Sequence, residues 1–391
     1  MKEGWEYKKL KEVGLTQTGT TPSKQIKAYY GGDIPFIRPA ELNVDQNGGV
    51  QYDSELKLTE EGALKSRVIK ANSVLMCCIG SVGKTGYTLN NVTCNQQINT
   101  LTPYDNYNPR FVYYALISPF FQQEVIKIAN SAKATLPIIS KGKWEILSIP
   151  IPPLSEQQSI VDYLDSAFAK IDAMKANAEK ALNEAKALFQ ASLKEMLEPK
   201  EGWEEKYLKD IAQYSIGLTY KPTNVCNDGT IVLRSSNIQE GKLDLKDIVR
   251  VNANIKEDLY VRTGDILMCS RNGSARLVGK VCIIPEIKEK MTYGTFMMII
   301  RSAYNPLLYH YFDTGLFRSQ IKHGEANMIN QITRYMLDEV KLNLPPVTEQ
   351  QSIVATLDSL KSKVDRLQEN YDKISQECDT LKQAILRQVF E

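Results

Sequence analysis

The sequence repeats itself once, with a period of about half of its 391 residues. A Gly-Trp-Glu triplet at residues 4–6 returns at residues 202–204, an offset of 198. The segment Pro-Pro-Leu-Ser-Glu-Gln-Gln-Ser-Ile-Val at residues 152–161 returns at 345–354 with Val and Thr in the third and fourth places, an offset of 193. Weaker echoes lie between these motifs: Val74-Leu75-Met76-Cys77 with Ile266-Leu267-Met268-Cys269, Gly83-Lys84 with Gly279-Lys280, and Asn108-Pro109 with Asn305-Pro306. A repeat of this length predicts two similar globular domains, each followed by the same second element.

The second element of each repeat is predicted to be a long helix. Ser155 with Gln158, and Thr348 with Gln351, have the spacing of a capping box directly after a Pro-Pro pair that cannot continue a helix. Apolar residues then alternate by four and three positions, which is the spacing of a heptad seam. In the first copy they are Ile160, Leu164, Ala167, Ile171, Met174, Ala178, Ala181, Ala185 and Leu188; in the second, 193 residues later, they are Ile353, Leu357, Leu360, Val364, Leu367, Tyr371, Ile374, Cys378 and Leu381. We expect helices over residues 155–198 and 348–391, each roughly 65 Å long at 1.5 Å per residue.

The narrow apolar stripe on each helix is flanked by charges and needs a partner. The other copy in the same chain is available, so we expect an antiparallel two-helix coiled coil with pseudo-two-fold symmetry. The first copy is rich in alanine where the second has Leu367 and Tyr371, so small side chains can face large ones. The alternative is a coiled coil between two molecules, in which the seam would be a dimer interface.

The two globular domains, residues 1–154 and 199–347, have the mixed pattern of α/β or α+β folds. Short apolar runs predict strands at residues 34–37, 74–79 and 98–102 of the first domain, and apolar periodicity predicts helices at 110–117 and 120–129. The second domain repeats the strands at residues 231–233, 266–269 and 296–301. The predicted fold class is therefore a tandem of α/β (α+β) domains joined to a long antiparallel two-helix coiled coil.

The net charge is only +2, but it is unevenly distributed. Residues 1–154 contain 17 Lys and Arg against 13 Asp and Glu, and residues 199–347 contain 20 against 17, whereas both predicted helices are acidic. The positive excess on the globular domains permits contact with phosphate without proving it. Seven cysteines without a Cys-x-x-Cys pair, and apolar stretches too short to cross a bilayer, lead us to expect a cytoplasmic protein with no membrane span. Cys77, Cys78 and Cys269 are expected in the core.

Residues suited to catalysis are scarce. His310 and His323 have no counterpart in the first domain, which argues against a histidine general base. The segment Gly-Ser-Val-Gly-Lys-Thr at residues 80–85 resembles the end of a phosphate-binding loop, but Cys78 stands where the first glycine should be. A turn between two strands, with Lys84 near a DNA phosphate, fits this segment better. We expect no metal site and no enzyme activity in this chain.

Several motifs together resemble the specificity subunits of type I restriction-modification systems. They are the Gly-Trp start, Thr20-Thr21-Pro22-Ser23 followed by Asp33-Ile34-Pro35-Phe36-Ile37-Arg38, Asn95-Gln96, and the twice-used Pro-Pro-[Leu/Val]-[Ser/Thr]-Glu-Gln-Gln-x-Ile-Val helix start. The resemblance covers essentially the whole chain, and the doubled Glu-Gln-Gln segment is its most specific part. The second domain departs from the pattern, with residues 217–222 in place of a Thr-Pro-Ser loop.

The resemblance implies two target-recognition domains, each reading one half of a bipartite site in double-stranded DNA, while the helices set the spacer and dock the partners. It implies two modification subunits that carry S-adenosylmethionine for adenine methylation, and restriction subunits that use ATP, with no cofactor on this chain. A helix of roughly 65 Å matches about two turns of B-DNA at 34 to 36 Å per turn. Two alternatives remain open: a coiled-coil scaffold that never binds DNA, and a self-sufficient methyltransferase or nuclease.

The residues expected to contact DNA are polar or basic and lie in the loops of the two domains. In the first domain they are Thr20, Thr21, Ser23, Lys24, Arg38, Lys84, Asn95, Gln96 and Lys133. In the second domain they are Lys221, Arg234, Asn237, Arg271, Asn272, Arg276, Lys280, Asn330 and Arg334. For each of them, support of the fold is the alternative role.

Overall fold

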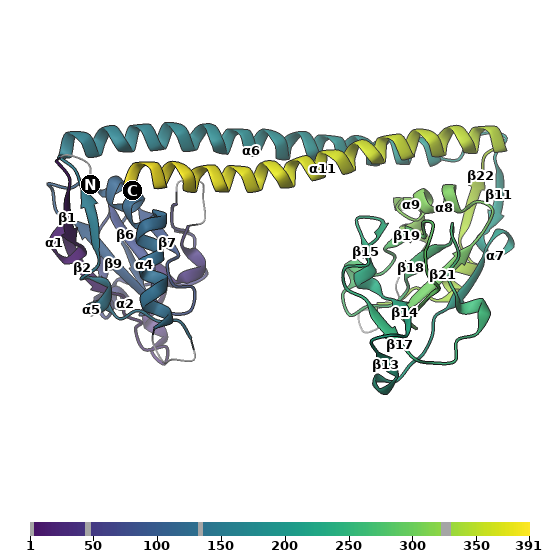
Figure 1. Ribbon diagram of the computed structural model, residues 1–391, viewed down its shortest axis with the longest axis horizontal. Helices are drawn as coiled ribbons and strands as arrows, with labels where there is room; N and C mark the ends of the chain where they lie inside the picture. The colour runs from purple at the N-terminus through teal and green to yellow at the C-terminus, as the bar shows by residue number, and fades with distance from the viewer. Residues whose placement is uncertain (1–3, 44–47, 132–135, 322–329) are drawn as a thin grey trace. The chain divides into compact units, whose positions relative to one another are not determined.

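The computed structural model describes residues 4–43, 48–131, 136–321 and 330–391. The chain forms two compact units: the first joins Met1–Lys180 to Asn370–Glu391, and the second is Ala181–Glu369. Each unit contains one globular domain, the beginning of one long helix and the end of the other (Figure 1).

The globular domain of the first unit contains two four-stranded sheets that share an apolar core. The antiparallel sheet has the order β2 (Gly14–Thr18), β9 (Ile98–Pro103), β6 (Ser73–Cys77) and β7 (Thr85–Thr88); the mixed sheet has the order β4 (Lys57–Leu58), β3 (Tyr30–Ile37), β8 (Val92–Cys94) and β5 (Val68–Ile69). Strand β6 is buried on both faces because alternate side chains point to opposite sides. Val74 and Met76 join the core under the helices, whereas Leu75 and Cys77 join the core of the mixed sheet.

Short helices cover the other face of the antiparallel sheet. They are α3 (Pro109–Ile117), α4 (Pro119–Asn130) and α5 (Lys141–Trp144), with α1 (Leu10–Val13) and α2 (Glu60–Leu64) elsewhere in the domain. Asn108 and Ser118 cap the first two, each with its side-chain oxygen accepting backbone N–H groups of the first turn. These caps explain why apolar helices start immediately after polar residues.

The globular domain of the second unit repeats this plan. Its antiparallel sheet has the order β12 (Gln213–Ile216), β21 (Met297–Arg301), β18 (Ile266–Cys269) and β19 (Val281–Ile283), and its mixed sheet has the order β13 (Val225–Cys226), β17 (Val249–Val251), β14 (Thr230–Leu233) and β20 (Met291–Tyr293). The remaining elements are α7 (Leu208–Ile211), α8 (Asn305–Tyr311), α9 (Gly315–Gln320), α10 (Arg334–Asp338) and the hairpin β15 (Ile238–Gln239) and β16 (Lys242–Leu243). Strand β18 is again buried on both faces. The parallel pair β14–β20 corresponds to β3–β8.

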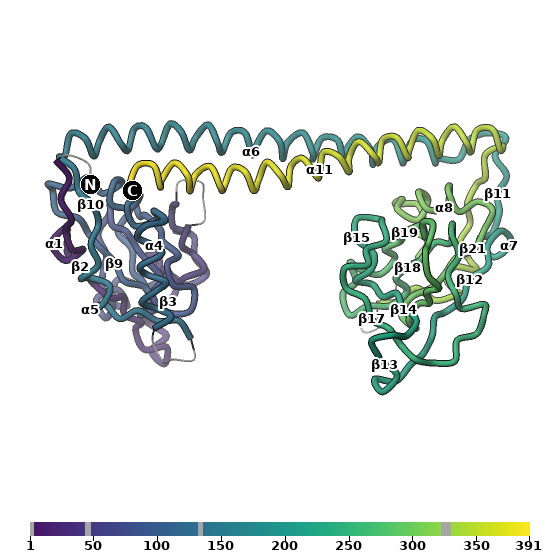
Figure 2. The backbone as a smooth tube through the Cα atoms, in the orientation of Figure 1, coloured from purple at the N-terminus to yellow at the C-terminus, as the bar shows by residue number. Residues whose placement is uncertain are grey.

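A two-stranded antiparallel ribbon joins each domain to a long helix. Strand β1 (Glu6–Lys9) pairs with β10 (Ser148–Ile151), and β11 (Glu204–Tyr207) pairs with β22 (Lys341–Leu344). Strands β10 and β22 lead directly into α6 (Leu154–Leu197) and α11 (Val347–Phe390), as the backbone trace in Figure 2 shows. Each long helix has 44 residues.

The predicted capping boxes are wrong. Both helices begin one residue earlier than expected, so Ser155 and Thr348 lie inside the first turn rather than at the cap. The side chain of Gln158 donates to Asp162 Oδ1, one turn further on, instead of reaching back to the start of the helix. Both helices begin at the residue directly after the Pro-Pro pair.

In each unit, α6 packs against α11 of the same chain. In the first unit Asp172 pairs with Lys382 and Lys175 pairs with Asp379, so the partner numbers fall as the α6 numbers rise. In the second unit both helices contribute to one apolar cluster. The pairing is antiparallel and intramolecular, which confirms the predicted coiled coil and does not require a second molecule.

The buried face of α6 agrees with the prediction in part. Leu164, Ile171, Ala178 and Ala185 are at least partly buried as expected, and Ile160 and Ala167 are partly buried against the core of the first unit. Ala181 is exposed, and Val161, Phe168, Leu182 and Phe189 are buried although they were not predicted. Met174 and Leu188 are 58% and 60% exposed. In α11 the predicted seam is correct until its last member, Leu381, which is 45% exposed.

The predicted strands and short helices are confirmed. The expected strands correspond to β3, β6 and β9 in the first domain and to β14, β18 and β21 in the second, and the expected helices are α3 and α4. Cys77, Cys78 and Cys269 are buried, as predicted. Over the described ranges, no helix is long and apolar enough to cross a membrane.

Candidate nucleic-acid interface

Four loops of each globular domain meet at one end of its sheets. In the first domain they follow β2 and β3 and connect β6 to β7 and β8 to β9. Pairing of β3 with β8, and of β9 with β2 and β6, brings these loops together. The corresponding loops of the second domain follow β12 and β14 and connect β18 to β19 and β20 to β21. Most of the predicted DNA-contacting residues lie on these loops.

The loop after β2, and its counterpart after β12, starts at a glycine. A Cβ on Gly19 would lie 2.2 Å from Asn95 O, and a Cβ on Gly217 would lie 2.3 Å from Gly294 O, so only glycine fits. The second domain therefore keeps the close backbone contact of this loop although it lacks the Thr-Pro-Ser sequence. Lys221, in the same loop, is exposed.

Amide side chains dominate the turn between β8 and β9. Thr21 Oγ1 donates to Gln96 Oε1 at 2.5 Å, which links this turn to the loop after β2. Asn95 Nδ2 donates to Gln97 Oε1 at 2.8 Å, so the two flanking amides are bonded to each other. Gln97 was not predicted as a site residue. The remaining predicted residues of the neighbouring loop are at least partly exposed: Thr20, Ser23 and Lys24.

Arg38 lies directly after β3 and is held by an acidic partner. Its Nη2 lies 2.5 Å from Glu41 Oε1, and its backbone N–H also donates to the Glu41 carboxylate. Burial by itself would raise the pKa of Glu41, but the hydrogen bonds from Arg38 outweigh it and hold that pKa below the ordinary glutamate value. Much of the Arg38 hydrogen-bonding capacity is therefore used within the loop.

Lys84 and Lys280 occupy corresponding places in the two domains and hold their turns in the same way. Lys84 Nζ donates to Pro39 O at 2.9 Å, and Lys280 Nζ donates to Ile238 O at 2.7 Å. Segment 80–85 is a turn between β6 and β7, as expected. Each ammonium keeps further donors, but its position is set by the loop that follows β3 or β14.

Asn237 is a correction to the predicted site. Its side chain is fully buried, with Nδ2 donating to Asp244 O and Asp247 O and with Oδ1 accepting from Arg234 N. It supports the loop after β14 and is inaccessible to DNA. The neighbouring Arg234 Nη2 pairs with Asp247 Oδ2 at 2.9 Å. Arg234 also lines a hollow of about 740 Å³ together with Tyr220 and Phe296.

The predicted residues of segment 271–276 differ in their contacts and exposure. The Arg271 guanidinium lies over the ring of Phe296, with Cζ 5.3 Å from the ring centroid. Asn272 is engaged in the loop, because its Nδ2 donates to Ser235 Oγ at 3.2 Å. Arg276 is exposed. Phe296, which was not predicted, is 54% exposed despite its size.

The last three predicted residues lie outside the four loops in sequence. Asn330 Nδ2 donates to Gly273 O at 3.3 Å, so it supports the 271–276 segment. Arg334 is exposed, with its guanidinium 5.9 Å from the ring centroid of Tyr214. Lys133 lies outside the described residues.

The sequence matches the type I restriction modification DNA specificity domain over residues 2–184 and again over residues 200–376. The chain belongs to this family. Each match takes in one globular domain and much of the long helix that follows, so the internal repeat is a repeat of the specificity domain.

The relatives of this specificity chain include subunits of type I restriction enzymes. The HindI specificity subunit of Haemophilus influenzae is 33% identical over 133 residues, which are 34% of this chain and 29% of the relative. The MjaIX specificity subunit of Methanocaldococcus jannaschii is 29% identical over 164 residues, which are 41% of this chain and 37% of the relative. The EcoKI specificity subunit of Escherichia coli is 29% identical over 420 aligned positions, covering 99% of this chain and 89% of the relative. The chain thus matches about a third of the first two relatives and most of the third.

Solved structures share the specificity fold over the full chain. A chain from a study of complex assembly and conformational transition in the type I restriction-modification system has a TM-score of 0.78 at 20% identity, covering 100% of this chain and 98% of the other. The HsdS subunit of Thermoanaerobacter tengcongensis has a TM-score of 0.55 at 19% identity, covering 100% and 97%. At such low identity these likenesses establish the fold.

The motifs that the specificity domains share most clearly form a structural junction away from the loops. Trp5 Nε1 donates to Glu156 Oε1 at 2.9 Å, and Trp203 Nε1 donates to Glu349 Oε2 at 3.0 Å. The tryptophan precedes the first strand of the ribbon, and the glutamate lies in the first turn of the long helix. The two repeated motifs, about 150 positions apart in the chain, therefore contact each other in both specificity domains.

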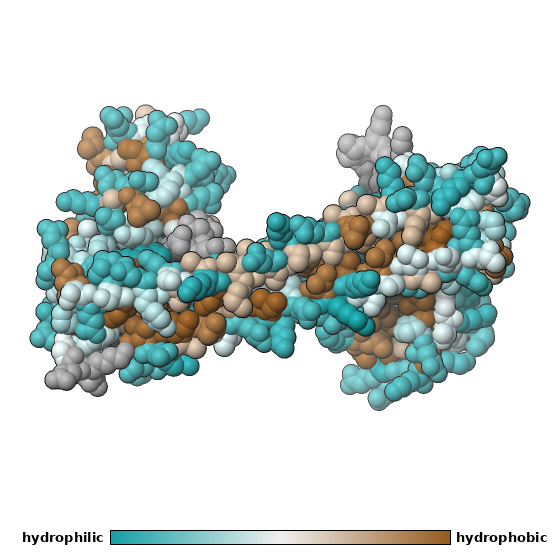
Figure 3. Space-filling view, turned by 90° about the horizontal axis from the view of Figure 1, so that it is seen from above, coloured by the Kyte–Doolittle hydropathy of each residue, from teal (hydrophilic) through white to brown (hydrophobic). Residues whose placement is uncertain are grey.

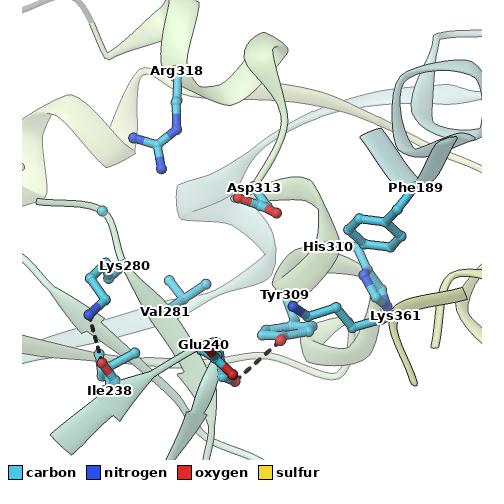
Figure 4. Close-up of a pocket in the computed structure, with 12 residues that line it drawn as sticks. Phe189, Ile238, Glu240, Lys280, Val281, Tyr309, His310, Asp313, Arg318 and Lys361 are labelled. Carbon is cyan, nitrogen blue, oxygen red and sulfur yellow. Dashed lines mark hydrogen bonds between the residues drawn. The ribbon is translucent and has the colours of Figure 1, made fainter. Parts of the chain in front are cut away.

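His310 also connects the second specificity domain to its long helix. It is 2% exposed, and its Nε2 donates to Asp358 Oδ1 of α11 at 2.8 Å. Burial lowers the pKa of His310 below its ordinary value, although Asp358 acts in the opposite direction. His310 lines a pocket of about 210 Å³. Figure 4 shows His310 at the edge of this pocket, with Arg318 and Asp313 on other sides. His323, the second histidine of the chain, lies outside the described residues.

Three buried thiols of the specificity domains are poorly suited to nucleophilic chemistry. Burial raises the pKa of Cys78, Cys94 and Cys282 to about 12, so these side chains stay protonated at neutral pH. Within the ranges that the structure describes, no three His, Cys, Asp or Glu side chains lie close enough to hold a metal ion.

Proposed function

We propose that the chain is a DNA sequence-specificity subunit in which residues 1–154 and 199–347 each read one half of a bipartite target in double-stranded DNA. One observation carries this proposal: both domains present loops from the same four strand ends, but with different side chains. Residues 95–97 are three amides where residues 294–296 are Gly, Thr and Phe. A common scaffold with divergent loop side chains suits the reading of two different sequences.

The two long helices, residues 155–198 and 348–391 in the proposed division, set the distance between the half-sites. Each observed helix of 44 residues spans about 66 Å at 1.5 Å per residue. That length corresponds to roughly two turns of B-DNA at 34 to 36 Å per turn. The heptad spacing in the sequence of both helices supports this role, because it is the spacing of helices that pair with each other.

The chemistry belongs to partner subunits: two modification subunits that use S-adenosylmethionine to methylate adenine, and restriction subunits that use ATP. The specificity chain itself is non-catalytic, carries no cofactor and works with DNA in the cytoplasm. Leu381 in the first unit and Leu188 in the second are 193 residues apart, the offset of the helix repeat, and both are exposed. Seen from above, Figure 3 shows hydrophobic residues exposed among hydrophilic ones on the long helices. Exposed leucines at equivalent positions of the two repeats can each contact one copy of the same partner. We assign this contact to the modification subunits.

The test is to express the chain with its modification subunits and to map methylated adenines at single-base resolution. The expected result is one bipartite motif, together with DNA binding that weakens steeply as salt concentration rises. A scaffold would give neither the motif nor salt-sensitive binding. Methylation or cleavage by the purified chain alone would contradict the non-catalytic role.

A further inference from the structure

The turn between β8 and β9 and the turn between β20 and β21 are the same structural element in the two domains. The first residue of each turn donates its backbone N–H to the end of the neighbouring parallel strand, Asn95 to Ile37 O at 3.1 Å and Gly294 to Leu233 O at 2.9 Å. The two turns therefore correspond residue by residue, although all three side chains differ. The two turns therefore present different side chains to any ligand that they contact.

In the first domain, the exposed amide of this turn is Gln96. The Thr21 hydroxyl donates to Gln96 Oε1 at 2.5 Å and so fixes which way the amide faces. Asn95 and Gln97 are bonded to each other and are not free to turn outward. Gln96 keeps two N–H donors and one lone pair on its oxygen. It offers a donor and an acceptor side by side, with no formal charge.

In the second domain, the corresponding turn carries an aromatic ring and a guanidinium. Phe296 is 54% exposed, and the Arg271 guanidinium lies over it at 5.3 Å from the ring centroid. The backbone of Arg271 is also fixed, because its N–H donates to Phe296 O at 3.1 Å and it forms a β-bridge with Gln331. Stacking and backbone anchoring hold the planar fork of donors in place at little further cost in entropy.

Arg271 differs from Arg38 and Arg234 in its electrostatic partners. Arg38 is held by Glu41, and Arg234 is held by Asp247. Among the residues that the structure describes, no carboxylate lies within ion-pair distance of Arg271. The corresponding position in the first domain is Ile79, which forms the equivalent β-bridge with Ile138. The charged fork is thus a feature of the second domain alone.

We infer, on the basis of the proposed DNA-recognition role, that the two domains read different base edges: Gln96 reads an adenine in one half-site, and Arg271 reads a guanine in the other. Adenine presents N7 as an acceptor and N6 as a donor in the major groove, which match the donor and acceptor of one amide. Guanine presents N7 and O6, both acceptors, which match the two parallel donors of a guanidinium. We assign Arg276 to a phosphate instead, because it is exposed and no ring among the described residues holds its guanidinium in place.

The first experiment compares the methylation motifs of variants in the reconstituted modification complex. Gln96→Ala is expected to relax one adenine position of one half-site, and Arg271→Ala one guanine position of the other, each by roughly 5- to 150-fold in discrimination. Thr21→Val should relax the same adenine position as Gln96→Ala, because it removes the group that orients the amide. Arg271→Lys should behave like Arg271→Ala, since it keeps the charge but loses the fork. The matched control Arg276→Ala should weaken binding without changing the motif.

A second experiment uses the unaltered chain, so it does not depend on the folding of a variant. Each guanine or adenine of the mapped motif is replaced in turn by its 7-deaza analogue, which lacks the N7 acceptor, and binding of the duplex is measured. One 7-deazaguanine in the half-site of the second domain should weaken binding, and the loss should disappear in Arg271→Ala; 7-deazaadenine should behave likewise with Gln96→Ala in the other half-site.

The outcomes separate this inference from the proposed function. A bipartite motif that is unchanged in both variants, or that relaxes at a different type of base, would overturn the base assignments and leave the recognition role standing. The same holds if deaza substitution is without effect in both half-sites. A wild-type complex that gives no bipartite motif would contradict the proposed function itself.

Discussion

An arginine at the corresponding position of the two domains is held by different partners, so the two arginines differ in how readily they can contact DNA. Arg38 and Arg234 both follow the strand of the parallel pair, and the backbone N–H of each donates to the residue three positions later. In the first domain that residue is Glu41, whose carboxylate also binds the guanidinium. In the second domain it is the neutral Asn237, and the guanidinium instead reaches the exposed Asp247. We therefore expect Arg234 to be easier to recruit to DNA than Arg38.

The Trp-Glu contact of each junction can be measured by a double-mutant cycle. Trp5→Phe, Glu156→Ala and the double variant should show a coupling of about 1 kcal/mol in the free energy of unfolding, since an indole N–H donating to a carboxylate is lost in each. The measurement is denaturant unfolding of the chain. Glu156→Gln is the matched control, because its side-chain oxygen can still accept the hydrogen bond. The cycle at Trp203 and Glu349 should give a similar value, and coupling near zero in both cycles would mean that the contact does not stabilise the junction.

Residue-scale prediction from the sequence succeeded in locating loops and failed in assigning partners. Polar and basic residues between predicted strands do lie at one end of the sheets, because the positions of the strands along the chain were readable from apolar runs. Asn237 was nevertheless placed at the interface, although it is fully buried, and Lys84 and Lys280 donate to backbone carbonyls. Conversely, Phe296 was missed because an aromatic residue in a strand-like run reads as core. Hydrogen-bond partners distant in sequence decide these roles, and a single sequence does not reveal them.

At the scale of single elements, the two long helices show what periodicity can and cannot predict. Their existence and length followed from sustained alternation by four and three, and the observed bounds differ by one residue. The buried face of α6 is wider than one seam, because Phe168 and Phe189 are buried as well as members of the predicted seam. Phe168 packs on Tyr114 and Phe189 on His310, both in the globular domains, so the register of the buried face is not set by α11 alone.

A matched pair of leucines in α6 tests this register. Leu182 is 3% exposed and Leu188 is 60% exposed, so Leu182→Ala should lower the free energy of unfolding by about 2 to 5 kcal/mol, whereas Leu188→Ala should change it by less than about 0.5 kcal/mol. Chemical denaturation of both variants measures the difference. Equal losses would show that the seam runs through the predicted positions instead.

Leu188 and Leu381 test the proposed docking of the modification subunits. Leu188→Ala should leave the chain stable but weaken its binding to the modification subunit, measured by titration calorimetry or analytical ultracentrifugation. Leu381→Ala should weaken binding at the equivalent place in the other unit, and the double variant should lose both copies. Unchanged affinity in the double variant would remove these leucines from the docking surface.

At the scale of the whole chain, each long helix completes the cores of both units. The first unit takes Leu386 and Phe390 from the end of α11, and the second takes Leu193 and Leu197 from the end of α6, at positions exactly one helix repeat apart. Neither core can therefore be completed by the domain and the helix start of a single repeat. The element proposed to set the spacer is also needed for folding, so its length cannot change without a change in both helices.

That coupling defines how the spacer proposal can be tested. Inserting seven residues at matching points near the middle of α6 and of α11 keeps the seam in phase and adds about 10 Å to each helix. At 3.4 Å per base pair this lengthens the spacer by up to about three base pairs, with both half-sites unchanged, as methylome sequencing of the reconstituted complex would show. Insertion in α6 alone, or of three residues in both helices, is the control: it moves apolar residues off the seam and should reduce the yield of folded chain. A heptad variant that folds and methylates with the original spacer would show that the helices do not set the distance between the half-sites.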